Sequence, residues 1–107
     1  MATASSVLTP VTRLAFVTGQ KNLTTGGIAE QLPNVPIPNG CKVILCAKPG
    51  NTGYVYFGNS KANAESSSNR FDRLEAGDSI PLQITNLNLI WVTSSVNGEG
   101  ISYYVEA

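Results

Sequence analysis

The chain has 107 residues, the size of a single domain, with seven Lys and Arg residues against seven Asp and Glu residues and no histidine. This balance gives no basic surface for nucleic acid or anionic lipid, and the longest apolar run, Val43 to Ala47, is far shorter than a membrane span. We therefore expect a single domain that binds neither nucleic acid nor membrane.

The first residues, "MATASSVLTP", are mostly small or polar and have neither the basic start nor the apolar stretch of a secretory signal. We expect residues 1–10 to form a flexible N-terminal arm and residues 11–107 to form one β-sandwich domain.

Short alternating or wholly apolar runs recur between turn residues, and no segment of ten or more residues has the apolar spacing of an amphipathic helix. The sequence therefore predicts an all-β fold, a single antiparallel β-sandwich that is jelly-roll-like and has about eight short strands. In chain order the predicted strands are Val11–Thr18, Ile28–Leu32, Cys41–Lys48, Gly53–Gly58, Arg70–Leu74, Ser79–Thr85, Leu89–Val96 and Ile101–Glu106.

In the first predicted strand, alternation points Leu14 and Phe16 towards the core. The segment Pro33–Pro38 holds three prolines, which cannot donate to a strand ladder, so it is expected at a sheet edge or in an extended crossover between sheets.

The strand Cys41–Lys48 is apolar on both faces, which indicates a central strand covered by the core on one side and by something else on the other. Cys41 and Cys46 would lie about 16 Å apart on opposite faces of this strand, too far for a disulfide. Both thiols are therefore predicted to be free and to contribute packing only, and two free thiols are compatible with a reducing cytoplasm.

The stretch "PGNTGYVYFGNS", residues 49–60, places Tyr54 and Tyr56 on one face of a strand and Val55 and Phe57 on the other. The following "KANAESSSNR" has no apolar anchor and is predicted to be a polar loop. In Ser79–Thr85 the inward side chains are predicted to be Ile80, Leu82 and Ile84.

The dipeptide Asn97-Gly98 is the strongest hairpin signal in the chain, and a two-residue loop there places Trp91 opposite Tyr104 on an outer face. The predicted core face of this hairpin carries Ile90, Val92, Val96, Ile101, Tyr103 and Val105.

Aromatic side chains on outer faces could form one exposed patch, the usual mark of an interaction site. The candidate protein-interface residues are Trp91, Tyr104, Tyr54, Tyr56 and Leu89. The alternative is that these residues are scattered over the surface or covered by the N-terminal arm.

The residue inventory offers little for catalysis. Without histidine there is no Ser-His or Cys-His nucleophile system, and two cysteines without histidine make a zinc site improbable. Asp72, Glu75 and Asp78 flank one glycine turn and are interpreted as solvated turn residues. We expect no enzyme, no catalytic residue, no cofactor and no metal.

The C-terminal half carries an ordered series of strand and turn motifs, "GYVYFGNS" and then "FDRLEAGDSIPLQITNLNLIWVTSSVNGEGISYYVEA", with "VPIPNGCKVILCAK" as the preceding strand. The positions that define the series are Gly53, Val55, Tyr56 and Gly58; Leu74, Gly77, Asp78 and Ser79; Asn86, Leu87, Asn88, Ile90 and Val92; and Gly98, Gly100 and Tyr103 or Tyr104. In this order the sequence resembles small virion proteins of tailed bacteriophages.

This resemblance implies a jelly-roll β-sandwich that acts as a capsid decoration (cement) protein or as a module of head fibres and tail appendages. Its partners would be the major capsid protein, whose shell it binds and stabilises, and copies of itself in a homodimer or homotrimer. It would be assembled in the host cytoplasm and reside on the capsid exterior of the virion. The alternative is a carbohydrate-binding or host-attachment module of a phage appendage, with Trp91 and the tyrosines as a stacking platform.

Overall fold

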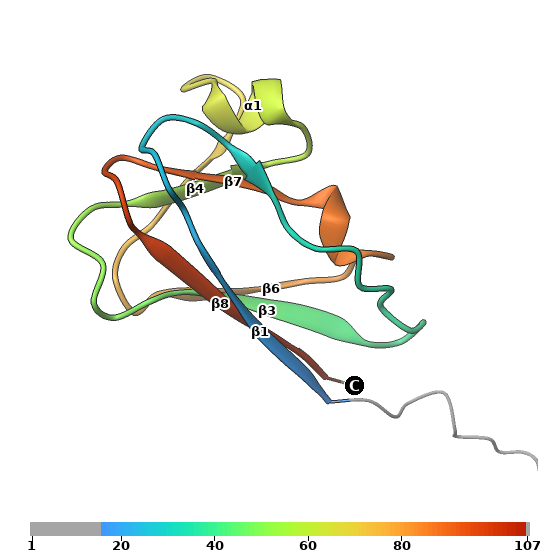
Figure 1. Ribbon diagram of the computed structural model, residues 1–107. Helices are drawn as coiled ribbons and strands as arrows, with labels where there is room; N and C mark the ends of the chain where they lie inside the picture. The colour runs from blue at the N-terminus through green and yellow to red at the C-terminus, as the bar shows by residue number, and fades with distance from the viewer. Residues whose placement is uncertain (1–15, 107) are drawn as a thin grey trace, which may run out of the picture.

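The computed structural model describes residues 16–106, which form eight strands, a short α-helix and a short 3-10 helix (Figure 1). The predicted arm, residues 1–10, lies outside the described residues. The elements are β1 (Val17–Asn22), β2 (Glu30–Gln31), β3 (Lys42–Ala47), β4 (Val55–Gly58), α1 (Lys61–Glu65), β5 (Phe71–Leu74), β6 (Ser79–Leu82), η2 (Leu87–Leu89), β7 (Trp91–Ser94) and β8 (Gly100–Glu106).

The strands form two antiparallel four-stranded sheets, in the orders β1-β8-β3-β6 and β2-β7-β4-β5. The first strand pairs with the last, the second with the seventh, the third with the sixth and the fourth with the fifth. Pairs between β3 and β8 and between β4 and β7 complete the two sheets. This is the strand order of a jelly roll, and it confirms the predicted all-β sandwich.

Each predicted strand has a counterpart in the fold, but the first is displaced along the chain. It was predicted at Val11–Thr18 and is found at Val17–Asn22, and residues 11–15, Leu14 among them, lie outside the described range. Phe16 was wrongly predicted to point inwards, because its side chain is 71% exposed. The ring of Tyr103 fills the inner face above Gly19, where an added Cβ would collide with the Tyr103 hydroxyl oxygen. The run around this glycine therefore lacks the apolar alternation that marks the other strands.

The core lies between the inner faces of the two sheets and confirms most of the predicted inward positions. Ile80, Leu82 and Ile84 are partly buried and pack against it, as predicted. Val96 was wrongly assigned to it, since its side chain is 38% exposed after the chain has left β7. The other predicted core residues of this region are buried, which confirms them: Ile90 just before β7, Val92 in β7, and Ile101, Tyr103 and Val105 in β8.

The Asn97-Gly98 turn exists, and Gly98 has a positive φ of 78°, but it does not close a hairpin. It connects β7 in one sheet to β8 in the other. The backbone N–H of Gly98 donates to the Leu23 carbonyl, and the Asn97 side chain accepts from the N–H of Gly26. The turn is therefore bound to the β1–β2 loop.

Because β7 and β8 lie in different sheets, the predicted cross-strand pair of Trp91 and Tyr104 is wrong. Trp91 lies opposite Gln31 on β2 and Gly58 on β4. Tyr104 lies opposite residues of β1 and β3.

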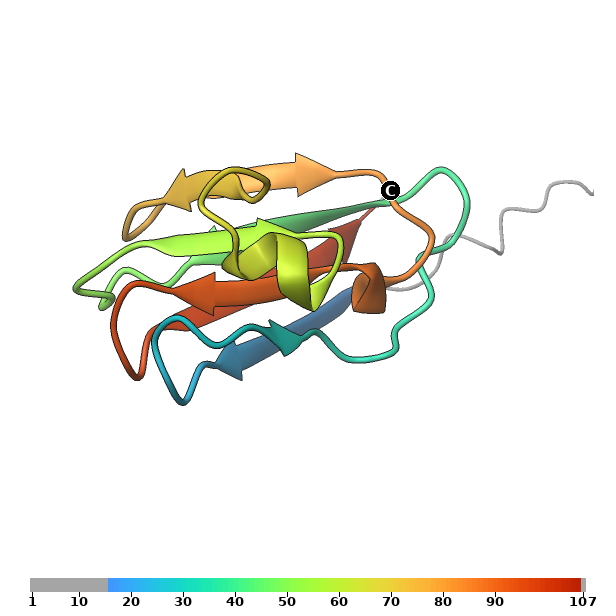
Figure 2. The ribbon, with the colours of Figure 1, turned by 90° about the horizontal axis from the view of Figure 1, so that it is seen from above.

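The predicted polar loop after β4 contains the helix α1, which lies against the outer side of β4 and β7 (Figures 1 and 2). The Ser60 side chain caps it by accepting from the N–H of Asn63. Ala64 supplies the apolar anchor that the sequence reading missed, since it is fully buried. In the part of the chain that is described, no helix has the length and apolar character needed to cross a membrane.

The segment Pro33–Pro38 is an extended crossover between sheets, as predicted, because it joins β2 to β3 and pairs only through a bridge between Pro36 and Asn86. The strand β3 lies between β8 and β6, as expected for a central strand. Its outward side chains Ile44 and Cys46 are only half-buried, and a covering element on that side stays a prediction. Both cysteines are free, as predicted; Cys41 is buried, whereas Cys46 is not.

Candidate functional site

The outer face of the β1-β8-β3-β6 sheet carries one line of side chains that crosses all four strands. Thr18 lies opposite Tyr104, Tyr104 opposite Ile44, and Ile44 opposite Pro81. Phe16 precedes this line at the β1 end. We call these five residues the bare sheet face, because no element within residues 16–106 lies over them (Figure 1).

The two aromatic rings of the bare sheet face lie beside one another. The ring centres of Phe16 and Tyr104 are 6.2 Å apart with a tilt of 43°. Phe16 is 71% exposed and Tyr104 36% exposed, and a shallow hollow of about 350 Å³ opens beside them. The loose ion pair of Lys42 and Glu106, 4.0 Å apart, lies at the neighbouring register position. A contiguous apolar face of this kind is typical of a protein contact.

The outer face of the other sheet is covered by α1 and the loop that follows it, and we call it the covered sheet face, defined by Tyr56, Gly58, Trp91 and Thr93. An added Cβ on Gly58 would lie 2.7 Å from the backbone nitrogen of Ala64, so the helix rests directly on this glycine. The Arg70 guanidinium lies 3.5 Å from the centre of the Tyr56 ring. Tyr56 is buried beneath these elements, and the prediction that it is exposed is wrong.

Two polar groups, one on Thr93 of the covered sheet face and one on the overlying Arg70, have no hydrogen-bond partner among residues 16–106. Thr93 is fully buried and its hydroxyl is unpaired, and the Nε of Arg70 is likewise buried and unpaired. Such groups cost stability when they are desolvated without a bond.

A groove of about 840 Å³ opens where the edge strands β5 and β6 of the two sheets face each other. The Phe57 and Phe71 rings stack in its wall, with centres 4.7 Å apart. The amides of Asn59, Asn63 and Asn69 line its rim, and no charged side chain of the described range lines it. We call it the edge groove; its apolar lining is Phe57, Phe71, Leu82, Ile84, Leu89 and Ile90.

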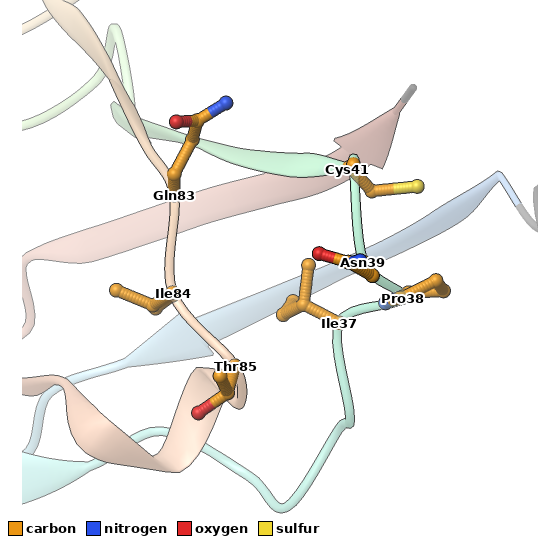
Figure 3. A pocket seen from close by; sticks show the side chains of 8 residues that line it. Ile37, Pro38, Asn39, Cys41, Gln83, Ile84 and Thr85 are labelled. Atoms are coloured by element: carbon orange, nitrogen blue, oxygen red, sulfur yellow. The ribbon is translucent and has the colours of Figure 1, made fainter.

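A smaller hollow of about 500 Å³ lies between the segment before β3 and the segment after β6 (Figure 3). Its walls carry Ile37 and Cys41 on one side and Gln83 to Thr85 on the other. The N–H of Ile37 donates to the Thr85 carbonyl at 2.9 Å and joins the two walls. The buried Cys41 is the one ionisable side chain that lines it within the described range.

The fold separates the five candidate interface residues, so the expectation of one aromatic patch is wrong. Tyr104 lies on the bare sheet face, whereas Tyr56 and Trp91 lie on the covered sheet face. Tyr54 precedes β4 and packs under Arg73, whose guanidinium is 4.1 Å from the ring centre. Leu89 is 49% exposed and lines the edge groove. Whether each residue contacts a partner stays a prediction.

Sequence reasoning missed the residues that complete the two exposed apolar surfaces. Phe16 was assigned to the core, and Phe71, now 42% exposed in the edge groove, was not singled out. Pro81 could have been found from alternation in Ser79–Thr85, which points it outwards when Ile80 and Leu82 point inwards. Ile44 could not, because its strand is apolar on both faces, and its alignment with Pro81 required the β3–β6 register.

Two carboxylates of the described chain, those of Asp78 and Glu99, hold loops. Asp78 accepts from the N–H of Glu75 at 3.0 Å, as expected for a solvated turn, and Gly77 between them has a φ of 88°. No group of three or more His, Cys, Asp and Glu residues that could hold a metal ion occurs in residues 16–106. The buried Glu99 carboxylate accepts from the N–H groups of Thr52 and Gly53 and so holds the loop before β4.

Two other carboxylates join the loops of the covered side. The N–H of Thr24 and then the ammonium of Lys21 lower the pKa of Glu30, and both donate to its carboxylate at 2.9 Å. The N–H of Ala29 and then the ammonium of Lys61 lower the pKa of Glu65, which joins α1 to the β1–β2 loop. These shifts follow from hydrogen bonding to the charged form.

The sequence matches no protein-family model and no curated protein. Among solved structures, the fold is similar to part of the IMPa metallopeptidase from Pseudomonas aeruginosa, with 12% sequence identity and a TM-score of 0.52. The similarity covers 87% of this chain but only 12% of that chain. At this identity the likeness concerns the fold alone.

Proposed function

We propose that the chain is a structural virion protein of a tailed bacteriophage, a decoration protein that attaches to the capsid exterior through the bare sheet face. The observation that carries this proposal is the line of Thr18, Tyr104, Ile44 and Pro81 across four strands, which no described element covers. The sequence resemblance of the C-terminal half to small phage virion proteins supports the same role.

The shape and chemistry of the bare sheet face suit attachment to a repeating shell. A sheet presents a broad face, and exposed aromatic rings such as those of Phe16 and Tyr104 are the side chains that most often dominate protein interfaces. Each copy needs to contribute only modest affinity, because many copies on one shell act together. In this proposal the partner is the major capsid protein, and copies of the chain also associate with one another.

The two free thiols are compatible with assembly in the reducing cytoplasm of the host. Cys41 and Cys46 are both free, and neither has the other as a neighbour across a sheet. Assembly in a reducing compartment therefore requires no disulfide.

In the carbohydrate-binding alternative, the sugar site would lie in the edge groove and not on the predicted aromatic platform. The platform of Trp91 and tyrosines has no geometric basis, because Tyr56 is buried and Tyr104 lies on the opposite sheet. One observation still favours sugar binding: the exposed Phe71 ring and the Asn59, Asn63 and Asn69 amides meet in the edge groove. A glycan array probed with the full chain tests it.

Cosedimentation with empty shells of the phage's major capsid protein tests the proposed function. Tyr104→Ser should weaken shell binding at least tenfold, because truncation of a ring in an interface centre removes more than about 1.4 kcal/mol. Ile28→Ser is the matched control, since Ile28 is 48% exposed but lies in the β1–β2 loop. Equal binding by wild type and Tyr104→Ser would contradict the proposal.

A further inference from the structure

We infer that the edge groove receives the N-terminal segment, residues 1–15, of a second copy of this chain. This inference deepens the proposed function, on which it rests for the association of copies, and states how one copy holds the next.

The edge groove exposes part of the core. Ile90 in its floor is almost fully buried, while Phe57, Leu82 and Ile84 pack against the core but remain partly accessible. Phe71 and Leu89 on its rim are 42% and 49% exposed. Insertion of apolar side chains here would remove core-lining surface from water.

One wall of the groove also offers free backbone. The strand β5 is an edge strand that pairs only with β4 among the described strands. An extended segment can add to such an edge through main-chain hydrogen bonds while alternate side chains enter the groove. The facing edge strand β6 carries Pro81, which has no N–H to donate. The structure therefore favours pairing along β5.

The chemistry of the groove matches the segment. Within the described range the groove has apolar and amide lining without charge. Residues 1–15 carry one charged side chain, Arg13, beside the apolar residues Val7, Leu8, Val11 and Leu14. Their serine and threonine hydroxyls can bond to the asparagine amides of the rim.

The geometry gives the segment the required reach. One line of register partners crosses the four strands from β1 to β6, through Val17, Val105, Val43 and Leu82. The start of β1 and the Leu82 side of the groove are therefore about 14 Å apart across the sheet. Fifteen extended residues span about 50 Å, which reaches well beyond one copy.

The strand order favours a second copy over the same chain. Val17 begins β1, one edge strand of its sheet, whereas the groove opens beside β6, the opposite edge strand. To enter its own groove, the segment would have to pass across the full width of the sheet, about 14 Å. A neighbouring copy needs no such crossing.

The test uses four full-length chains in sedimentation velocity: wild type, the segment variant Val7→Ser/Leu8→Ser, the groove variant Leu89→Ser, and Ile28→Ser. Leu89 and Ile28 are 49% and 48% exposed, so both substitutions leave the core intact. Wild type and Ile28→Ser should associate, whereas the segment and groove variants should each associate at least tenfold more weakly. A synthetic peptide of residues 1–15 should dissociate the wild-type assemblies.

An equimolar mixture of the segment and groove variants gives the sharpest result. The intact groove of one variant can accept the intact segment of the other, so the mixture should recover mixed assemblies that neither variant forms alone. The inference is overturned if the mixture shows no recovery, or if wild type is monomeric. It is also overturned if the groove retains a neutral glycan on an array irrespective of the segment substitutions. A monomeric chain that still binds shells through Tyr104 would refute this inference and the association of copies, and would keep the proposed attachment to the shell.

Discussion

The two outer faces of the sandwich carry comparable side chains in different surroundings. Tyr56 and Tyr104 both point outwards from a central strand, yet Tyr56 is 8% exposed beneath Arg70 and α1, whereas Tyr104 is 36% exposed beside Phe16. The β2-β7-β4-β5 sheet is covered by α1, which belongs to the connection between β4 and β5. The other has no cover from residues 16–106, and this asymmetry is the basis on which we propose it as the attachment face.

A matched pair of tyrosine substitutions, one on each outer face, should give the largest difference in the free energy of unfolding. Tyr56→Ser should lower the free energy of unfolding by about 3 kcal/mol, because it removes a buried ring and its contact with Arg70. Tyr104→Ser should cost less than about 1 kcal/mol, since its ring is partly in solvent. Urea denaturation of both variants measures the difference; equal losses would contradict the assignment of covered and bare faces.

Removal of the buried Thr93 hydroxyl on the covered sheet face should increase the stability of the protein. Thr93→Val keeps the side-chain shape and removes an unpaired polar group, so it should raise the free energy of unfolding by about 1 kcal/mol. Thr18→Val, on the exposed bare sheet face, is the control and should change it little. A loss of stability in Thr93→Val would mean that the hydroxyl has a bonding role.

The smallest expected effect concerns pH and the attachment of α1. Hydrogen bonds hold the pKa values of Glu30 and Glu65 below the ordinary glutamate value of 4.5, so their stabilisation is full above that value and is lost as the pH falls through the lowered folded-state values. Glu65→Gln should therefore lower the stability at pH 7 and flatten the loss on acidification. If the difference from wild type were the same at pH 3 and pH 7, the Glu65 contacts would not contribute through ionisation.

The sequence predicted the strands because alternation along a strand is a local property. Val92, Tyr103 and Val105 were placed in the core by their period alone, and their burial confirms it. The strand count and the absence of long helical periods then favoured the jelly roll, which the pairing order confirms.

The candidate surfaces could not be predicted in the same way, because they depend on which strands become neighbours. Asn97-Gly98 has the local signature of a hairpin, but hydrogen bonds to the β1–β2 loop make it a connection between sheets. The cover over Tyr56 depends on a five-residue helix whose one buried anchor is Ala64. Neither distant contact leaves a periodic signal in the sequence.

The most direct test of the central claim is electron microscopy of empty shells decorated with the full chain, at a resolution that separates the two sheets. The account predicts that the β1-β8-β3-β6 sheet faces the shell, with Phe16 and Tyr104 in the contact and α1 directed away from it. A decorated shell in which α1 and the β2-β7-β4-β5 sheet form the contact, or shells that bind no copies of the chain, would contradict it.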